Sequence, residues 1–421
     1  MKHSWIIIAF SIALTACGSD VGEEVPVSSD SPIVVTGLVN QKDGTRATMN
    51  GLGGIDRWEV GDQFAVSARY YRSTTTTLAQ DFMSDVPVIY TLSATGNPWY
   101  GTTDKYFWNY NPVRYWPQNG YLDFYAVYPV DYLNNNLDRM RLFHEDLDRT
   151  VITTRFYLDA PQAPDANGHY HDAEEQWDLM FSHRPHLSKP DVTTPVRFRF
   201  THAEMAVRFW TEDLDIGNNA DITIDRISLN NIHTGGLITA TDITDWQAYY
   251  KEFGSTSEGT TTNTAGAKTP VRLDYSWDWS GADPLAADVR ATYTQDMDFL
   301  WAYTDANGFH SQPKGTEIKP NHPADNDKPN KQTFIIPPQC LDKDSGSSIT
   351  VYFTIHDAGG KTITDSRTFN VELCGEAGDV LDIHLSLGQQ SSTDQYLIEV
   401  VSATLTPWEE AKGSLNTGLE D

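Results

Sequence analysis

The chain has 421 residues, which is enough for two domains that each bury a core of their own. It carries 30 Lys and Arg against 58 Asp and Glu, a formal net charge of −28, and the acidic residues are spread along its whole length. This balance excludes nucleic acid as a partner, because binding to phosphates needs clustered Lys and Arg, and it indicates a solvated acidic surface.

The N-terminus has the pattern of a secretory signal. A short positive end precedes the apolar run 5–14, which is too short to span a bilayer, and small residues follow it. Residues 14–17 read Leu-Thr-Ala-Cys and fit the lipobox of bacterial lipoproteins, whose cysteine receives acyl chains such as palmitate. We therefore expect a lipoprotein signal peptide over 1–16 and lipidation of Cys17, which anchors the protein to membrane lipid. A plain signal peptide with an incidental cysteine is the alternative.

Residues 17–32 are polar and acidic and contain proline, so we interpret them as a flexible tether. An aspartate directly after the cysteine often retains bacterial lipoproteins at the inner membrane. Here that position is Gly18, which permits export. We expect the protein to be exposed at the cell outer membrane, tethered to it without crossing it.

Short alternating runs bounded by Gly, Pro, Asn and Asp recur along the chain, and this pattern is typical of an all-β protein. In the first half we expect strands at 33–39, 64–71, 88–92, 106–110, 122–128 and 151–158. In the second half we expect them at 196–200, 222–229 with a parity break inside, 334–336, 349–355, 369–373, 383–387 and 396–405. A stretch rich in Pro, His and acidic residues runs from 160 to 195, and we place a domain boundary within it, near residue 190. The expected domains are therefore an N-terminal β-sandwich over 33–190 and a C-terminal β-sandwich over 191–421.

The tract 115–129 holds six aromatic rings in fifteen residues. Within it, Leu122, Phe124, Ala126 and Tyr128 share one face of a strand, and the other face is apolar except for Asp123. A sugar-binding platform would place its rings on a solvent face beside carboxylates and amides. We therefore predict a central strand that is covered on both faces.

Several motifs, in this order, make the chain resemble the fimbrillin family of Bacteroides-type bacteria, which comprises fimbrial subunit and tip lipoproteins. No single motif is specific, but their order and spacing agree over about 350 residues. They are the lipobox at Cys17, Thr45-Arg46-Ala47 ahead of Trp58-Glu59-Val60-Gly61-Asp62, Tyr115-Trp116-Pro117, the tract 122–129, Asp178-Leu179-Met180, residues 198–206, residues 334–339 and Leu405-Thr406-Pro407-Trp408. One departure is the family's W-x-x-G-x-x-Y element, because residues 375–381 keep the glycine and lack the aromatic residues.

The resemblance implies two tandem transthyretin-like β-sandwich domains and a fimbrial (pilus) subunit, anchor or tip adhesin. It also implies assembly by protease-triggered donor-strand exchange: a protease cuts after Arg46, before Ala47, and the groove left by the first strand accepts a strand of another fimbrial subunit. The implied location is the fimbrium, and the implied partners are other subunits and a host or bacterial surface receptor. Arg46 as a plain turn residue is the alternative.

Cys340 and Cys374 are the remaining cysteines of a chain expected in an oxidising compartment. They form a candidate disulfide that would close a loop of about 35 residues. Two small buried thiols are the alternative.

The sequence offers little for catalysis, and we expect no enzyme, no cofactor and no metal. It contains no G-x-S-x-G, H-E-x-x-H, P-loop or G-x-G-x-x-G element. A group of His and acidic residues matches no established metal site and indicates a polar linker: His169, His171, Asp172, Glu174, His183 and His186. Residues 342–346 resemble the start of a calcium loop but lack its closing glutamate. His202 is expected to be a buried, hydrogen-bonded side chain.

Two other functions stay open at this point. A glycan-binding outer-membrane lipoprotein of a polysaccharide-uptake system would present solvent-facing tryptophans, for example Trp99, Trp108, Trp277 or Trp279. A secreted hydrolase on a β-scaffold would bring two carboxylates together in a cleft.

Overall fold

The computed structural model describes residues 27–39, 60–72, 80–92, 106–128, 151–157, 178–188, 195–215, 220–244, 273–278, 289–320, 334–357, 359–390 and 395–407. These residues form strands and the turns between them, and they contain no helix, so the all-β prediction is confirmed. Accordingly, the part of the chain described here contains no helix that is long and apolar enough to cross a membrane.

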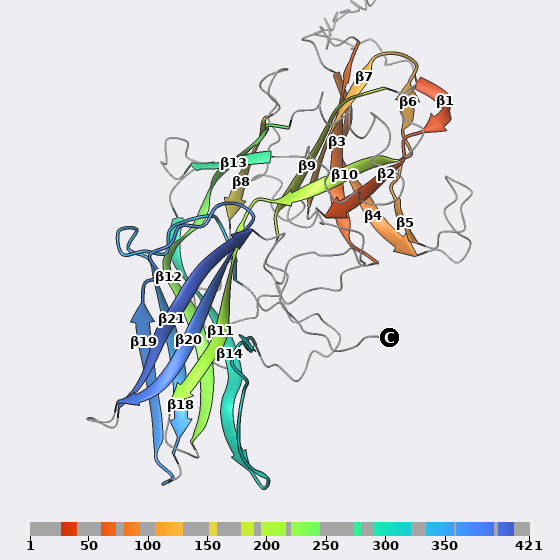
Figure 1. Ribbon diagram of the computed structural model, residues 1–421. Helices are drawn as coiled ribbons and strands as arrows, with labels where there is room; N and C mark the ends of the chain where they lie inside the picture. The colour runs from red at the N-terminus through yellow and green to blue at the C-terminus, as the bar shows by residue number, and fades with distance from the viewer. Residues whose placement is uncertain are drawn as a thin grey trace, which may run out of the picture.

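The described residues form twenty-one strands, whose arrangement is shown in Figure 1. The strands of the first half are β1 (Val27–Pro32), β2 (Val35–Val39), β3 (Gln63–Tyr71), β4 (Gln80–Leu92), β5 (Tyr106–Asn109), β6 (Tyr115–Pro117), β7 (Tyr121–Tyr128), β8 (Val151–Tyr157), β9 (Met180–Leu187) and β10 (Val196–His202). The strands of the second half are β11 (Met205–Asp215), β12 (Asp221–Asp242), β13 (Leu273–Asp278), β14 (Val289–Asp305), β15 (Gly308–Ser311), β16 (Glu317–Ile318), β17 (Phe334–Ile336), β18 (Ser348–His356), β19 (Thr362–Phe369), β20 (Asp379–Gln390) and β21 (Gln395–Pro407).

The first half builds one large sheet with the strand order β2-β10-β9-β7-β3-β4-β5. Neighbouring strands are antiparallel except for β2, which runs parallel to β10. A separate small sheet pairs β1 with β6. Along the chain, the sheet changes between His202 of β10 and Met205 of β11, some residues after the boundary that we expected near residue 190.

The second half packs two sheets face to face. One has the order β16-β11-β20-β21, with β17 also on β11, and the other has the order β15-β14-β12-β18-β19. Apolar side chains of both sheets, such as Phe209 of β11 and Ile224 of β12, meet in one buried cluster. Strand β12 extends beyond this sandwich, and its last residues pair with β8 and β13 (Figure 1).

Strand β7 confirms the prediction made for the aromatic tract, since it lies between β3 and β9 and its six inner residues are buried. Its two faces enter different cores. Phe124 belongs to the cluster of the first half, where it meets Trp116 and Phe198 edge to face, whereas Tyr125 and Val127 belong to the cluster that fills the second half. The first sheet is therefore covered on its second face by the β12–β13 end of the other half.

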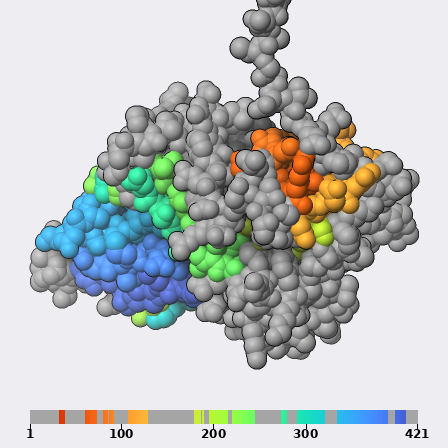
Figure 2. Space-filling view, turned by 90° about the horizontal axis from the view of Figure 1, so that it is seen from above, coloured from red at the N-terminus to blue at the C-terminus, as the bar shows by residue number. Residues whose placement is uncertain are grey.

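Polar contacts join the two halves at this place. His183 of β9 contacts the carboxylate of Asp242 at the end of β12, and the ring of His183 stacks on Tyr125. The hydroxyl of Tyr275 in β13 donates to the carbonyl of Thr201 in β10 at 3.0 Å. The large first sheet and the sandwich lie side by side in the space-filling view (Figure 2), with orange N-terminal strands at one end and blue C-terminal strands at the other.

Three local expectations were wrong. Residues 151–157 pair with β12 and not with the strands of the first half, because β12 is long enough to reach them. Residues 27–32 form β1 in place of a flexible tether, since their main chain pairs with β6. The strand expected at 369–373 lies earlier, at β19, because the tight turn at Gly359 and Gly360 sets the hairpin register and aligns 362–369 with β18. The expected single strand with a parity break is confirmed, since the register of β12 shifts between Ile224 and Arg226.

Candidate functional site

Strand β2 is an edge strand of the large sheet, and among the described strands it pairs with one neighbour. Its five residues pair with β10 from Val35 opposite Val196 to Val39 opposite Phe200, and no described strand pairs with its other edge. An edge strand presents main-chain groups that another strand can pair with, and it can leave a sheet without disturbing the strands between. This makes β2 and its neighbours the candidate site.

Two apolar side chains anchor this segment. Ile33 is 1 % exposed and Val35 is 3 % exposed, and both belong to the core cluster that also contains Phe198 and Phe200 of β10. Thr36, which points to the other face, is only half-buried. Full burial of an Ile or Val side chain contributes about 1.5–3 kcal/mol, so these two residues supply much of the affinity of the segment for its place.

Main-chain hydrogen bonds fix the segment further. The amide of Val196 donates to the carbonyl of Val34 at 2.7 Å, and the amide of Ile33 donates to the carbonyl of Arg114 at 2.8 Å. The hydroxyl of Tyr110 donates to the carbonyl of Ile33 at 2.6 Å. Burial raises the pKa of Tyr110 to about 12, so this hydroxyl stays protonated and remains a donor at neutral pH. Sequence reasoning did not find Tyr110 or Arg114, because nothing in their neighbourhood marks a contact with Ile33.

The residues that the resemblance marked for processing, Arg46 and Ala47, and the lipidation residue Cys17 lie outside the described residues. The same is true of the His and acidic residues between 169 and 174 and of Trp99 and Trp279. In the sequence, Arg46 follows the end of β2 at Val39 by seven residues (46 − 39).

Trp108, proposed as a solvent-facing platform, is 5 % exposed and packs against Phe64 at a ring distance of 4.5 Å. The solvent-facing position that the glycan-binding alternative required of Trp108 is therefore contradicted. Trp277 is half-buried and packs against the larger core cluster. The buried ring of Trp108 is therefore not available to stack against a sugar.

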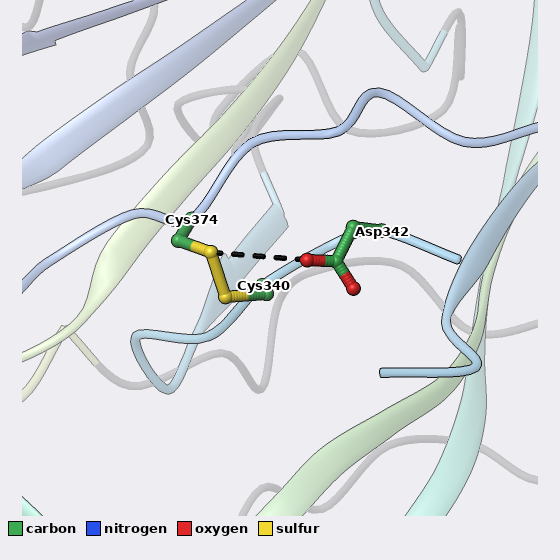
Figure 3. A group of neighbouring side chains, drawn as sticks. All are labelled: Cys340, Asp342 and Cys374. Atoms are coloured by element: carbon green, nitrogen blue, oxygen red, sulfur yellow. Dashed lines mark hydrogen bonds between the residues drawn. A yellow bond between two sulfur atoms is a disulfide. The ribbon is translucent and has the colours of Figure 1, made fainter. Parts of the chain in front are cut away.

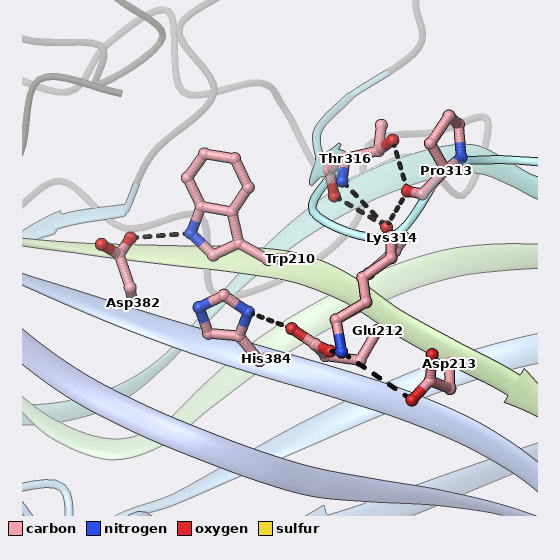
Figure 4. A network of polar contacts seen from close by, with 9 residues as sticks. Trp210, Glu212, Asp213, Pro313, Lys314, Thr316, Asp382 and His384 are labelled. Carbon is pink, nitrogen blue, oxygen red and sulfur yellow. Dashed lines mark hydrogen bonds and ion pairs between the residues drawn. The ribbon is translucent and has the colours of Figure 1, made fainter. Parts of the chain in front are cut away.

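A polar cluster lies on the outer face of β11 and β20 (Figure 4). Arg208 forms two hydrogen bonds to Asp382, at 2.6 and 2.8 Å, and the Trp210 ring contacts both the Arg208 guanidinium and the His384 ring. Glu212 contacts His384 and Lys314, and the hydrogen bond from Lys314 is the main reason why the pKa of Glu212 is lowered. The carboxylates of Glu212, Asp213 and Asp382 are thus each engaged with a cation, which is the arrangement of a structural network.

Buried ionisable groups lie where β10 passes into β11. His202 is bonded to Asp178 at 2.8 Å, which confirms that it is a buried, hydrogen-bonded side chain. Glu204 is fully buried, and one of its oxygens accepts from the amide of Leu179 at 2.7 Å. Burial, and then the nearby Asp178, raise the pKa of Glu204 well above its ordinary value. These groups stabilise the short segment in which the chain passes from β10 in the first sheet to β11 in the second.

Cys340 and Cys374, the pair that the sequence marked, are joined by a disulfide (Figure 3). The main chain beside them is paired as well, with the amide of Leu341 donating to the carbonyl of Leu373 at 2.9 Å. The Cys374 sulfur lies 3.9 Å from a carboxylate oxygen of Asp342. Since metal ions bind thiolates and both sulfurs here are bonded to each other, this group does not form a metal site.

Comparisons with known proteins give matches among solved structures. A fimbrial protein from Bacteroides vulgatus is 13 % identical with a TM-score of 0.44, and the match covers 82 % of this chain and 92 % of that one. Proteins described as cell adhesion proteins from Bacteroides uniformis and Bacteroides ovatus are 12 % and 14 % identical, with TM-scores of 0.39 and 0.37. These two matches cover 90 % of this chain and 99 % and 98 % of those chains. A search of curated proteins finds no match. A family model described as fimbrillin-like matches residues 45–408.

Proposed function

Because this chain belongs to the fimbrillin-like family, we propose that it is a surface lipoprotein that joins other fimbrial subunits by donor-strand exchange at the position of β2. The family consists of structural and adhesion proteins, and the chain is accordingly a fimbrial, cell-surface protein and not an enzyme. The lipid anchor, the outer membrane and the exchange step are the parts that we propose.

The observation that supports exchange most directly is the place of β2. The strand lies at the edge of its sheet, it is short, and it pairs with β10 alone among the described strands. Its removal would leave the main chain of β10 unpaired beside the buried side chains of Phe198 and Phe200. An extended segment that offers alternating apolar side chains would restore both the hydrogen bonds and the burial.

The proposed trigger is a cut between Arg46 and Ala47. This cut would separate β1 and β2 from the rest of the chain, because both strands precede Arg46. Before the cut, the covalent link gives the chain's own strand a high effective concentration at its site, which excludes a competing strand. After the cut, a strand from a neighbouring subunit competes on equal terms, so assembly follows processing.

The proposed membrane anchor is acylated Cys17, ahead of the segment that the cut would release. A chain that keeps its N-terminus would stay attached to the outer membrane, and a processed chain would depend on neighbouring subunits for attachment. In this proposal, the unprocessed chain is therefore the anchor and the processed chain is the polymer subunit.

The test is intact-mass and N-terminal analysis of the protein recovered from the native cell surface, beside an unboiled SDS gel. We expect a start at Ala47 and a ladder of oligomers. The variant Arg46→Ala should keep the earlier start and lose the ladder, whereas Lys42→Ala, a change in a basic residue of the same stretch, should leave both unchanged. An acylated start at Cys17 with monomer alone would overturn polymerisation by exchange.

A further inference from the structure

The chain enters β2 through a closed set of three hydrogen bonds. The amide of Ile33 donates to the carbonyl of Arg114 at 2.8 Å, the amide of Arg114 donates to the Tyr110 oxygen at 3.3 Å, and the Tyr110 hydroxyl donates to the carbonyl of Ile33 at 2.6 Å. Each of the three residues donates one of these hydrogen bonds and accepts another. Tyr110 is 8 % exposed and its bond to Ile33 is buried, whereas Arg114 is exposed and its bond to Tyr110 is partly buried.

We infer that Tyr110 and Arg114 form a main-chain clamp that holds the entry of any strand occupying the place of β2, including a strand of a second copy of this chain. The inference rests on the proposed strand exchange for its second part. For its first part, the clamp on the chain's own strand, it rests on the contacts alone.

The clamp adds to the sheet without recognising a particular side chain. The ladder between β2 and β10 pairs main-chain groups, and the clamp likewise binds one amide and one carbonyl, which every residue except proline offers. The buried side chains of Ile33 and Val35 therefore select the register, and the clamp holds the chain where it enters the strand.

The location of the clamp suits this role. Ile33 lies between β1, which pairs with β6, and β2, which pairs with β10. Tyr110 and Arg114 lie between β5 and β6, so they stay with the body of the molecule when β1 and β2 leave. A donor strand must therefore supply a free amide at the Ile33 position, and proline is excluded there.

The first experiment uses the uncut chain and measures hydrogen exchange at the Ile33 amide. In Tyr110→Phe the carbonyl of Ile33 loses its donor, and we expect exchange at Ile33 to become roughly ten-fold faster. Tyr70→Phe is the matched control, because it removes a buried tyrosine hydroxyl bonded elsewhere, to Asn119 at 2.7 Å. Unchanged exchange at Ile33 in Tyr110→Phe would overturn the clamp.

The second experiment measures the binding of a separate strand. A chain with a specific protease site inserted after residue 40 is folded, cut, and incubated with an excess of the 27–39 peptide. The affinity of the peptide is measured by competition against a labelled copy of the same peptide.

We expect the peptide to bind about ten-fold more weakly to Tyr110→Phe than to the otherwise unchanged chain, and equally well to Tyr70→Phe. A peptide with an ester in place of the Ile33 amide bond lacks the donor to Arg114 and should bind about ten-fold more weakly, without any change in the protein. Equal affinities in all these pairs would refute the clamp. A cut chain that binds no peptide would refute strand exchange, and the first experiment would still decide the clamp.

Discussion

The place of β2 allows a quantitative prediction for Val35→Ala. Val35 is 3 % exposed, and the substitution removes two buried methyl groups worth about 0.8 kcal/mol each, to which a small residual cavity adds. We expect the free energy for release of β2 to fall by about 2 kcal/mol, which raises the released population about 30-fold.

Native-state hydrogen exchange measures this release, because the amides of Ile33 and Val196 are protected by bonds that break when β2 leaves. Both should exchange about 30-fold faster in Val35→Ala, while amides of β18 stay unchanged. Thr36→Ala is the matched control, since Thr36 lies in the same strand on the other, half-buried face. The reasoning is refuted if the two substitutions act equally, because side-chain burial would then not be what holds β2.

Three further substitutions test the stability of the remainder. Replacing Cys340 and Cys374 by serine opens a loop with a sequence separation of 34, so the free energy of unfolding in urea should fall by about 4 kcal/mol; no change would contradict the cross-link. Burial raises the pKa of Glu317 to about 7, so the folded state loses stability as pH rises from about 4.5 to 7. In urea titrations, Glu317→Gln should remove about 3 kcal/mol of this dependence on pH. Glu399→Gln, a change at an exposed residue, is the control and should leave the dependence in place. Phe124→Ala should lower the free energy of unfolding by about 3–5 kcal/mol, because Phe124 is fully buried; a loss below 1 kcal/mol would mean that its ring is not part of the core.

The folded state should thus be most stable at mildly acidic pH with respect to Glu317 and Glu204, since the pKa of each is raised by burial. The sign follows from linkage: a carboxyl whose pKa is higher in the folded chain binds its proton more tightly there, so loss of that proton at higher pH favours unfolding.

The processing and lipidation residues, unlike the strands, rest on sequence motifs alone. Cys17, Arg46 and Ala47 come from motifs and from family resemblance, and they stay predictions because they lie outside the described residues. The transthyretin-like topology and the exact extent of the two domains are predictions of the same kind. The candidate disulfide needed only two cysteines in an oxidising compartment, and the structure brings Cys340 and Cys374 together.

The sequence by itself determined where most strands lie and which of their faces are apolar. Alternation is a local property, so the strand at 121–128 and its two covered faces could be predicted from eight residues. The parity break in β12 was visible for the same reason. The pattern that predicts the signal peptide is equally local, and that call stays a prediction because residues 1–16 lie outside the described residues.

Only the tertiary structure decided which strands pair and which polar groups meet. Periodicity gives the face of a strand but not its neighbour, so β8 joined β12, and β2 found β10 across the first half of the chain in a parallel pair. The bond between Tyr110 and Ile33 spans 77 residues, and that between His183 and Asp242 spans 59. Contacts of this kind depend on how sheets stack and close, which is a property of the whole folded chain and leaves no mark in the local pattern of residues.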